Sequence, residues 1–223
     1  EKISSKKIGL GVTDSSFVEL KDDGKGVFKT ELYTNERAAY LIDRFLGINL
    51  TPPTTIRTLD GETGSMQEFI PDAIMYGEIE FKTIDEEDDF NEKHREEFMK
   101  MWVLDLIIGN FDRHTHNFLF SGDTLYTIDH SHSLSINFDE FIKKVNVYVG
   151  YYRFFDKELP TVLAQSINKF LENFEYQQIL EDLLEEILGK DFAVACLKRI
   201  RLIGKMIVET GKINERALEY AKL

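Results

Sequence analysis

The chain has 223 residues, enough for one ordinary domain or for two small lobes that share a cleft. Its 43% apolar and 30% charged residues are typical of a compact globular protein and exclude an extensively disordered one. The net charge of −13 argues against direct binding to nucleic acid or to an anionic membrane, because both partners are also negatively charged.

Two further features bear on where the protein acts. No run approaches the roughly 18 apolar residues of a membrane span, and the start of the chain, EKISSKKIGL, lacks the apolar core of a signal peptide. The single cysteine, Cys196, excludes an internal disulfide and a thiolate zinc cage, and its flanks predict a buried helical position. We expect a soluble cytoplasmic protein with no membrane partner.

Short strands and turns fill the first 70 residues. The runs KIGLGV, SSFVEL and GVFKTEL predict a small antiparallel sheet. Thr34 is the expected N-cap of a helix, NERAAYLIDRFLG, which ends at Gly47. TIRTLDGETGSMQEFI predicts two more strands joined by a glycine turn, and Pro71 follows them. We therefore divide the chain into a strand-rich part, 1–72, and a second part, 73–223.

Helices are expected over much of the second part. Ten acidic residues lie between positions 78 and 97, a pattern typical of a solvated loop and helix start rather than of a binding site. From Glu92, a helix that is apolar nearly all round toward Gly109 should be buried. Helical periodicity continues after residue 160, so the fold class is α+β. The aromatic run KKVNVYVGYYRFF fits packing or a partner groove.

The segment 108–134, IGNFDRHTHNFLFSGDTLYTIDHSHSL, contains four of the five histidines and three aspartates. FLF and LYTI flank the turn SGDT and should form a hairpin. Asp112 and Asn117 precede its first strand and Asp129 follows its second, so all three lie at the same end. Amide and carboxylate oxygens suit Mg²⁺, and Asp112 would remain to orient or deprotonate a hydroxyl.

The pattern Asp-Arg-His-x-x-Asn at 112–117, followed by a hairpin and Ile-Asp at 128–129, resembles the catalytic and metal-binding loops of the atypical kinases. These are the phosphoinositide 3- and 4-kinases and the bacterial HipA-like protein kinases. The resemblance runs from about residue 9 to residue 134. It implies a two-lobed protein-kinase-like fold, with a small β-rich N-lobe of one helix (1–72) and a mainly helical C-lobe (73–223).

The resemblance also implies roles for the predicted residues. Lys29 would hold the ATP phosphates and pair with Glu36, with Glu31 as the weaker partner. The phosphate-covering loop would contain Thr13, Ser15 and Ser16, and the adenine-binding hinge would contain Glu68 and Ile70. Asp112 would orient or deprotonate the hydroxyl that accepts the phosphate, and Asn117 with Asp129 would hold Mg²⁺ or Mn²⁺. His114 would stabilise the loop by hydrogen bonds or polarise the transferred phosphoryl group.

The implied reaction is transfer of the γ-phosphate of ATP to a hydroxyl. The acidic composition favours Ser or Thr of a substrate protein, and a phosphoinositide or small-molecule kinase stays open. Some HipA-like kinases are toxins that modify their own phosphate loop, so Ser15 and Ser16 are candidate autophosphorylation sites and a neutralising partner protein is conceivable. Asp129-His130-Ser131 stands where typical protein kinases have Asp-Phe-Gly, which argues against an activation-loop switch of their kind.

Three other interpretations remain. The histidine pairs 114/116 and 130/132 could bind Zn²⁺ or Fe²⁺ with a nearby aspartate, but that site leaves Lys29 and Glu36 unexplained. A pseudokinase that only binds nucleotide would have no need of all the retained polar residues. Finally, the polar residues of this segment could be buried groups that stabilise loops in an unrelated α+β domain.

Overall fold

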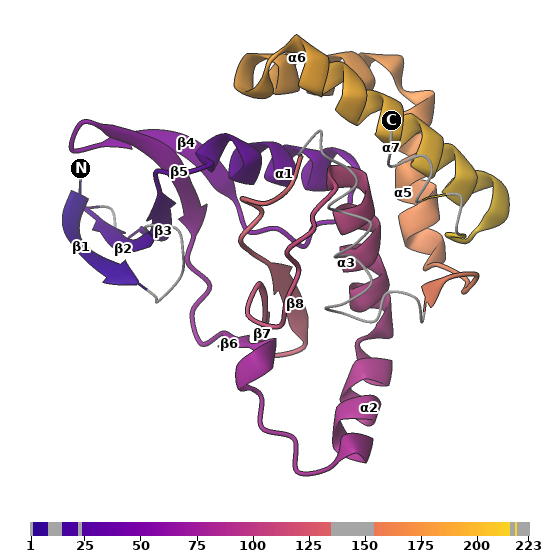
Figure 1. The fold of residues 1–223 in the computed structure, drawn as a ribbon, viewed down its shortest axis with the longest axis horizontal. Coiled ribbons are helices and arrows are strands. Elements are labelled where there is room, and N and C mark those ends of the chain that lie inside the picture. The colour runs from indigo at the N-terminus through magenta and orange to yellow at the C-terminus, as the bar shows by residue number, and fades with distance from the viewer. Residues whose placement is uncertain (1, 9–14, 22–23, 135–153, 215–216, 218–223) are drawn as a thin grey trace.

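The first part of the computed structural model is a five-stranded antiparallel sheet with the strand order β1-β2-β3-β5-β4 (Figure 1). The structure describes residues 2–8, 15–21, 24–134, 154–214 and 217. The strands are β1 Lys2–Ile8, β2 Ser15–Leu20, β3 Lys25–Lys29, β4 Thr54–Leu59 and β5 Glu62–Glu68. The predicted strand SSFVEL and the hairpin around the glycine turn are therefore confirmed. The predicted GVFKTEL strand is too long at its end, because β3 stops at Lys29 and leaves Glu31 exposed.

Helix α1, Tyr33–Phe45, follows β3 and ends before Gly47, which has a positive φ of 67°, as predicted. The prediction that Thr34 is its N-cap is wrong. The cap position is Leu32 in the left-handed conformation, and no side chain caps the helix there. The first turn is held instead by a distant loop, because the Asn35 amide donates to the carbonyls of Ser131 (2.8 Å) and Ser133 (3.0 Å).

A second, three-stranded sheet has the order β6-β7-β8. Its strands are β6 Ile74–Met75, β7 Phe118–Ser121 and β8 Thr124–Thr127, and the short 3-10 helix η1, Tyr76–Glu78, follows β6. Phe120 pairs with Leu125, which confirms the predicted hairpin. The chain passes from the first sheet to the second between Glu68 and Ile74, the stretch that contains the boundary we placed at residue 72.

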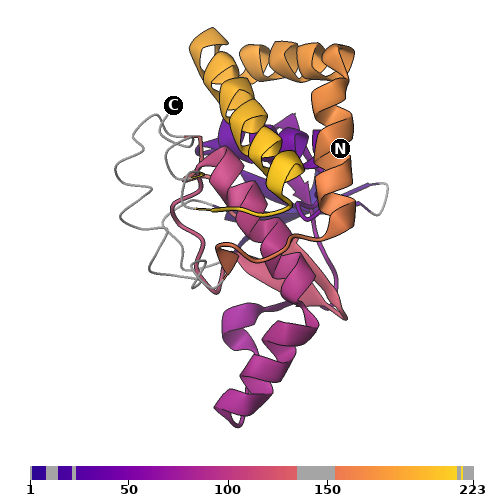
Figure 2. The same cartoon turned by 90° about the vertical axis from the view of Figure 1, so that its right-hand side faces the viewer.

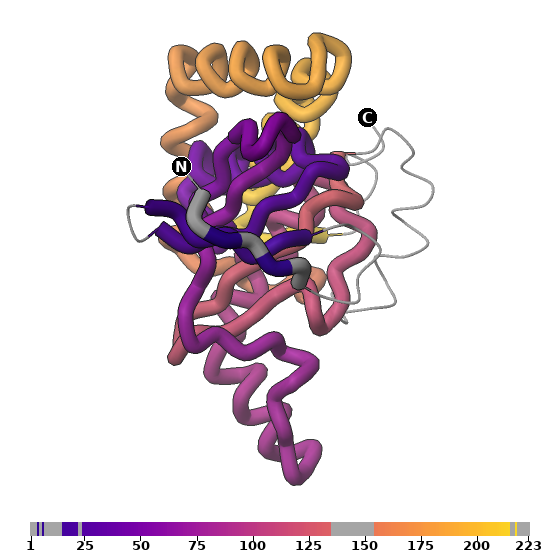
Figure 3. The backbone as a smooth tube through the Cα atoms, turned by 90° about the vertical axis from the view of Figure 1, so that its left-hand side faces the viewer, coloured from indigo at the N-terminus to yellow at the C-terminus, as the bar shows by residue number. Residues whose placement is uncertain are grey.

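Two consecutive helices precede the hairpin in the chain. Helix α2, Ile84–Lys93, has no buried residue and projects from the body of the molecule (Figure 3), as its acidic composition predicted. Helix α3, Arg95–Ile108, is buried nearly all round. The predicted start of this helix at Glu92 is wrong, because His94 interrupts it and packs its ring against Phe90 and Phe120, with centroids 4.5 and 4.8 Å apart.

Among the residues that the structure describes after 153, the helices are α5 Thr161–Glu172, α6 Phe174–Leu188 and α7 Lys190–Thr210. Helix α6 packs on α1 and α7 packs on α3 (Figures 1 and 2). Cys196 is buried in this core, as predicted. Most of KKVNVYVGYYRFF lies outside the described residues, but Phe154 and Phe155 at its end pack against Trp102. None of the helices within the described ranges is long and apolar enough to cross a membrane.

Candidate functional site

Three charged side chains meet where the end of β3, the first turn of α1 and the chain after β8 come together. The Lys29 ammonium, at the end of β3, lies 2.8 Å from Oε1 of Glu36 on α1 and 3.0 Å from Oδ1 of Asp129 after β8. Lys29 is 8% exposed and Glu36 1%. Buried charges are stable only when they are paired, so this arrangement depends on all three elements being in place. The predicted pair of Lys29 with Glu36 is present, and Asp129 joins it.

Electrostatics fix the charge state of this cluster. Burial alone lowers the pKa of Lys29, but the carboxylates of Glu36 and Asp129 outweigh burial and raise it. Burial alone raises the pKa of Asp129, but Lys29 and a hydrogen bond from Ser131 outweigh it and hold this pKa at about 2. At neutral pH, Lys29 is therefore a cation and Asp129 an anion.

Asp129 has a strained backbone, with a φ of 54° in the left-handed region that residues other than glycine rarely adopt. The strand β8 ends two residues earlier, and this turn aims the carboxylate at Lys29. The hydroxyl of Ser131 donates to Oδ1 at 2.7 Å, the same oxygen that Lys29 approaches. Within the described residues, both contacts therefore use Oδ1 and leave Oδ2 for an incoming cation.

Asn117 and Asp112 lie at the start of the hairpin, in the loop between α3 and β7. The Asn117 side-chain amide donates to the backbone carbonyl of Asp112 at 2.8 Å, so its donor is used and its oxygen Oδ1 is the atom that could face a cation. The backbone N–H of Asp112 donates to Oδ1 of Asn110 at 3.0 Å. Asn117 is buried and Asp112 is half-buried, so the loop is fixed while the Asp112 carboxylate stays accessible.

The four histidines of this segment have different surroundings. His114 accepts a hydrogen bond at Nδ1 from the backbone N–H of His116, at 3.2 Å, which ties the loop together. The ring of His132 packs on Phe111, and His130 is fully buried. In the part of the chain that the structure describes, which includes all four histidines, no three His, Cys, Asp or Glu side chains are grouped to hold a metal ion. The structure therefore does not support the transition-metal interpretation.

A buried ion pair that sequence reasoning missed supports the loop. The guanidinium of Arg113 makes two 3.0 Å contacts with the carboxylate of Asp105 on α3, and it also donates to the backbone carbonyls of Asn117 and Ile128. Arg113 thus connects α3, the start of β7 and the end of β8. The available signal was Asp105 itself, the one carboxylate in the apolar second half of α3.

The predicted phosphate-covering loop needs a correction. Ser15 and Ser16 are not loop residues; they begin β2, where Ser15 pairs with Lys29 and Ser16 with Phe28. Their backbones are therefore part of the hydrogen-bond ladder between β2 and β3. Thr13 lies outside the described residues.

The predicted hinge lies at the end of β5. Glu68 is the last, exposed residue of that strand, and its backbone N–H already donates to the carbonyl of Pro53 at 2.8 Å. Ile70 follows the strand and is half-buried. Of the two, Ile70 is therefore the better candidate for a backbone donor to adenine.

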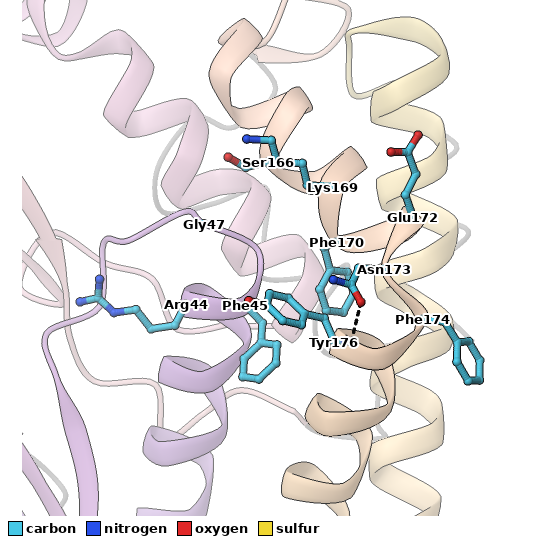
Figure 4. A pocket seen from close by; sticks show the side chains of 10 residues that line it. All are labelled: Arg44, Phe45, Gly47, Ser166, Lys169, Phe170, Glu172, Asn173, Phe174 and Tyr176. Atoms are coloured by element: carbon cyan, nitrogen blue, oxygen red, sulfur yellow. Dashed lines mark hydrogen bonds between the residues drawn. The ribbon is translucent and has the colours of Figure 1, made fainter.

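A cavity of about 620 Å³ lies away from this cluster, between the C-terminal end of α1, helix α5 and the start of α6 (Figure 4). Phe45, Phe170 and Tyr176 meet at its centre, and Arg44 and Lys169 lie at its edges. None of the residues predicted for the functional site lines it, so the candidate site rests on the charged cluster and not on this cavity.

Comparison with known proteins identifies the family. Residues 31–190 match the family model of phosphatidylinositol 3- and 4-kinases. The chain belongs to this kinase family. The matched range includes Glu36, Asp112, Asn117 and Asp129 and begins two residues after Lys29. A search of curated proteins found no significant match.

Solved kinase structures share the fold. A Helicobacter pylori proinflammatory kinase, CtkA, is similar over 98% of this chain and 96% of its own, with a TM-score of 0.60 and 14% identity. The Golgi casein kinase with Mn/ADP bound is similar over 92% of this chain and 72% of its own, with a TM-score of 0.56 and 16% identity. The predicted α+β kinase-like fold, with a small antiparallel N-lobe and a helical C-lobe, is confirmed.

Proposed function

We propose that this protein is an ATP-dependent kinase that transfers the γ-phosphate to a Ser or Thr hydroxyl of a protein, in the manner of the HipA-like kinases. The observation that carries the proposal is the buried contact of Lys29 with both Glu36 and Asp129. A cation on the third strand, paired with a carboxylate of the following helix, is the arrangement that kinases use at the ATP phosphates.

The residues present fit a divalent metal ion. Asp129 is ionised and keeps Oδ2 for a ligand, and Asn117 has its amide oxygen to offer, so the pair supplies two hard oxygen ligands of the kind Mg²⁺ or Mn²⁺ binds. A metal bound there would neutralise charge on the ATP phosphates. Lys29 would add a second positive charge, and the Glu36 carboxylate would keep the ammonium in place.

The acceptor side of the reaction is assigned to Asp112. Its half-exposed carboxylate would orient or deprotonate the incoming hydroxyl, while the hydrogen bond from the His116 backbone to His114 would keep the loop in shape. Transfer itself then needs positioning and stabilisation of dispersed negative charge. The segment that contains Thr13 and leads into β2 would cover the phosphates, and the backbone near Glu68 and Ile70 would contact adenine.

A protein acceptor is favoured by charge. The chain has 40 acidic and 27 basic residues, a poor match for an anionic lipid surface. The second candidate is a phosphoinositide, which the family match favours. A cytoplasmic location and a neutralising partner protein also remain predictions.

Phosphate transfer from γ-labelled ATP tests the proposal. Wild type and Asp129→Ala are incubated with Mg²⁺ or Mn²⁺, alone, with a cell lysate and with phosphoinositide vesicles. Labelled protein that is lost in the variant supports a protein kinase, and labelled lipid alone would support the second candidate. Nucleotide-dependent thermal stabilisation without any transfer would indicate a pseudokinase. Intact mass after ATP incubation tests autophosphorylation, and peptide mapping then tests whether Ser15 or Ser16 is the site.

A further inference from the structure

We infer that His130 and Thr51 are positioning residues that together lock the metal-binding loop, residues 128–133, in the geometry that phosphate transfer requires. Neither residue would touch the nucleotide. The inference rests on the proposed function and deepens it, because it assigns the control of Asp129 to a buried polar lock. We call this contact the 51/130 lock.

Besides the hydrogen bonds that its carbonyl accepts from Ser133 within the loop, His130 makes polar contacts with three distant residues. Its backbone N–H donates to Oε2 of Glu36 at 3.1 Å. Its ring Nδ1 lies 3.2 Å from Nη2 of Arg113, and its ring Nε2 lies 3.4 Å from the hydroxyl of Thr51. His130 is 0% exposed. The residue next to Asp129 therefore has no freedom to move without losing buried hydrogen bonds.

The hydrogen-bond partners of the His130 ring determine which of its two nitrogens carries a hydrogen. A guanidinium can only donate, so Nδ1 of His130 must accept from Arg113. Nε2 then carries the hydrogen and donates to the Thr51 hydroxyl, which can donate onward to Thr127 at 3.1 Å. A flipped ring would place carbon atoms against both partners.

Thr51 is held as firmly as the histidine. It is 1% exposed, its backbone N–H donates to Oδ2 of Asp43 at 3.3 Å, and its carbonyl accepts from Arg44 at 3.2 Å. Both partners lie at the C-terminal end of α1, whose first turn carries Glu36. The first turn of α1 therefore holds the 128–133 loop through Asn35 and Glu36, and its C-terminal end holds the loop through Thr51.

The lock has a consequence for regulation. In typical protein kinases, a Phe follows the metal-binding Asp, and its packing sets the active or inactive state. An apolar ring can move between apolar pockets, but a buried imidazole loses hydrogen bonds in any pocket without matching partners. His130 therefore keeps Asp129 beside Lys29 in the protein without any modification.

Matched variants at Thr51 test the lock. Thr51→Val removes the hydroxyl and Thr51→Ser keeps it, while His130→Asn keeps an acceptor for Arg113 and loses the contact to Thr51. Thr54→Val is the control, because Thr54 is equally buried, at 2%, and bonds Pro52 and Gln67 in the first sheet. A general effect of losing one buried hydroxyl should appear in this control as well.

Two measurements are made on each full-length variant. The first is amide hydrogen exchange of residues 128–133 without ligand, and the second is the Mg²⁺ concentration at which ATP half-maximally stabilises the protein against heat. Thr51→Val should speed exchange about tenfold, as expected for loss of one buried hydrogen bond, and should raise the Mg²⁺ requirement severalfold. Thr51→Ser and Thr54→Val should match wild type in both measurements. The effect of combining Thr51→Val with His130→Asn in one protein should be smaller than the sum of the two single effects.

The possible outcomes distinguish a failure of the 51/130 lock from a failure of the proposed kinase function. If Thr51→Val behaves like Thr54→Val in exchange, the lock is refuted even where wild type binds Mg·ATP. If Thr51→Val speeds exchange but Mg²⁺ dependence is unchanged, the lock holds the loop but does not position the metal ligand, and the inference fails. If wild type shows no stabilisation by Mg·ATP, the proposed function fails first and takes with it the role assigned to the lock.

Discussion

The two sides of the candidate site are built differently. On the phosphate side, Lys29, Glu36 and Asp129 come from three elements and are fixed by contacts of 2.8 and 3.0 Å. On the acceptor side, Asp112 is half-buried, and its hydrogen bonds to Asn110 and Asn117 are made by its backbone. Phosphate groups require charges that are already in place, whereas the acceptor side must admit a hydroxyl of another molecule. In the proposed function, the rigid side would hold the phosphates and the accessible side would admit the acceptor hydroxyl.

The largest effect is expected from a substitution that disturbs both sides of the candidate site at once. Arg113 joins them, because it binds Asp105 and the carbonyls of Asn117 and Ile128. Arg113→Met would leave the Asp105 carboxylate buried without its cation, which costs about 3–5 kcal/mol. The free energy of unfolding in urea measures this loss. The double change Asp105→Leu with Arg113→Met should recover much of it, and no recovery would contradict the role of Arg113 as a partner of Asp105.

A change confined to the phosphate side should remove turnover without unfolding the protein. Asp129→Asn keeps the shape but loses the charge opposite Lys29 and the anionic metal ligand. We expect metal-dependent phosphate transfer to fall by about 10²- to 10³-fold, as when one preorganised electrostatic group is removed from an active site. Transfer rates at saturating Mg²⁺ measure it, with circular dichroism as the control for folding. Unchanged rates would remove Asp129 from the site.

A change confined to the acceptor side should separate binding from transfer. Asp112→Asn should leave the affinity for Mg·ATP within about twofold, because its carboxylate lies outside the Lys29 cluster, while transfer falls about 100-fold, in the range for a lost acid–base group. Nucleotide titration and labelled-phosphate transfer measure the two quantities. A parallel loss of both would mean that Asp112 also holds the nucleotide.

The smallest effect is on the pH dependence of stability, where two carboxylates act in opposite directions. Burial raises the pKa of Asp43 to about 7, above its unfolded value, so its contribution is full at low pH and is lost as pH rises toward 7. The pKa of Asp129 is lowered to about 2, so its contribution is present above pH 4 and is lost as pH falls toward 2.

Urea unfolding at a series of pH values tests both carboxylates. Relative to Asp43→Asn, wild type should lose about 2 kcal/mol between pH 5 and pH 7. Relative to Asp129→Asn, wild type should lose stability between pH 4 and pH 2. Parallel curves for wild type and the Asp43 variant would show that this carboxyl does not titrate in the window.

The sequence predicted the rigid half better than the contacts that support it. The resemblance to kinases predicted the pair of Lys29 with Glu36, and the spacing of the hairpin predicted that Asn117 and Asp129 lie at the same end of it. The contact of Thr51 with His130 was not predictable, because these two residues lie 79 positions apart in the chain. Hydrogen bonds at such separations leave no local pattern.

The predicted starts of α1 and α3 were wrong because contacts with distant parts of the chain determine them. The start of α1 is held by the contacts of Asn35 with Ser131 and Ser133, so the local capping signal of Thr34 was misleading. The break before α3 depends on the packing of His94 against Phe120. In each case a tertiary contact outweighed a local preference.

A crystal structure with Mn²⁺ and a non-hydrolysable ATP analogue would test the central claim most directly. The account predicts the metal on the side-chain oxygens of Asn117 and Asp129, with Lys29 at the phosphates and still paired with Glu36. Metal bound elsewhere, for example between His114 and His116, or nucleotide bound away from Lys29, would contradict it.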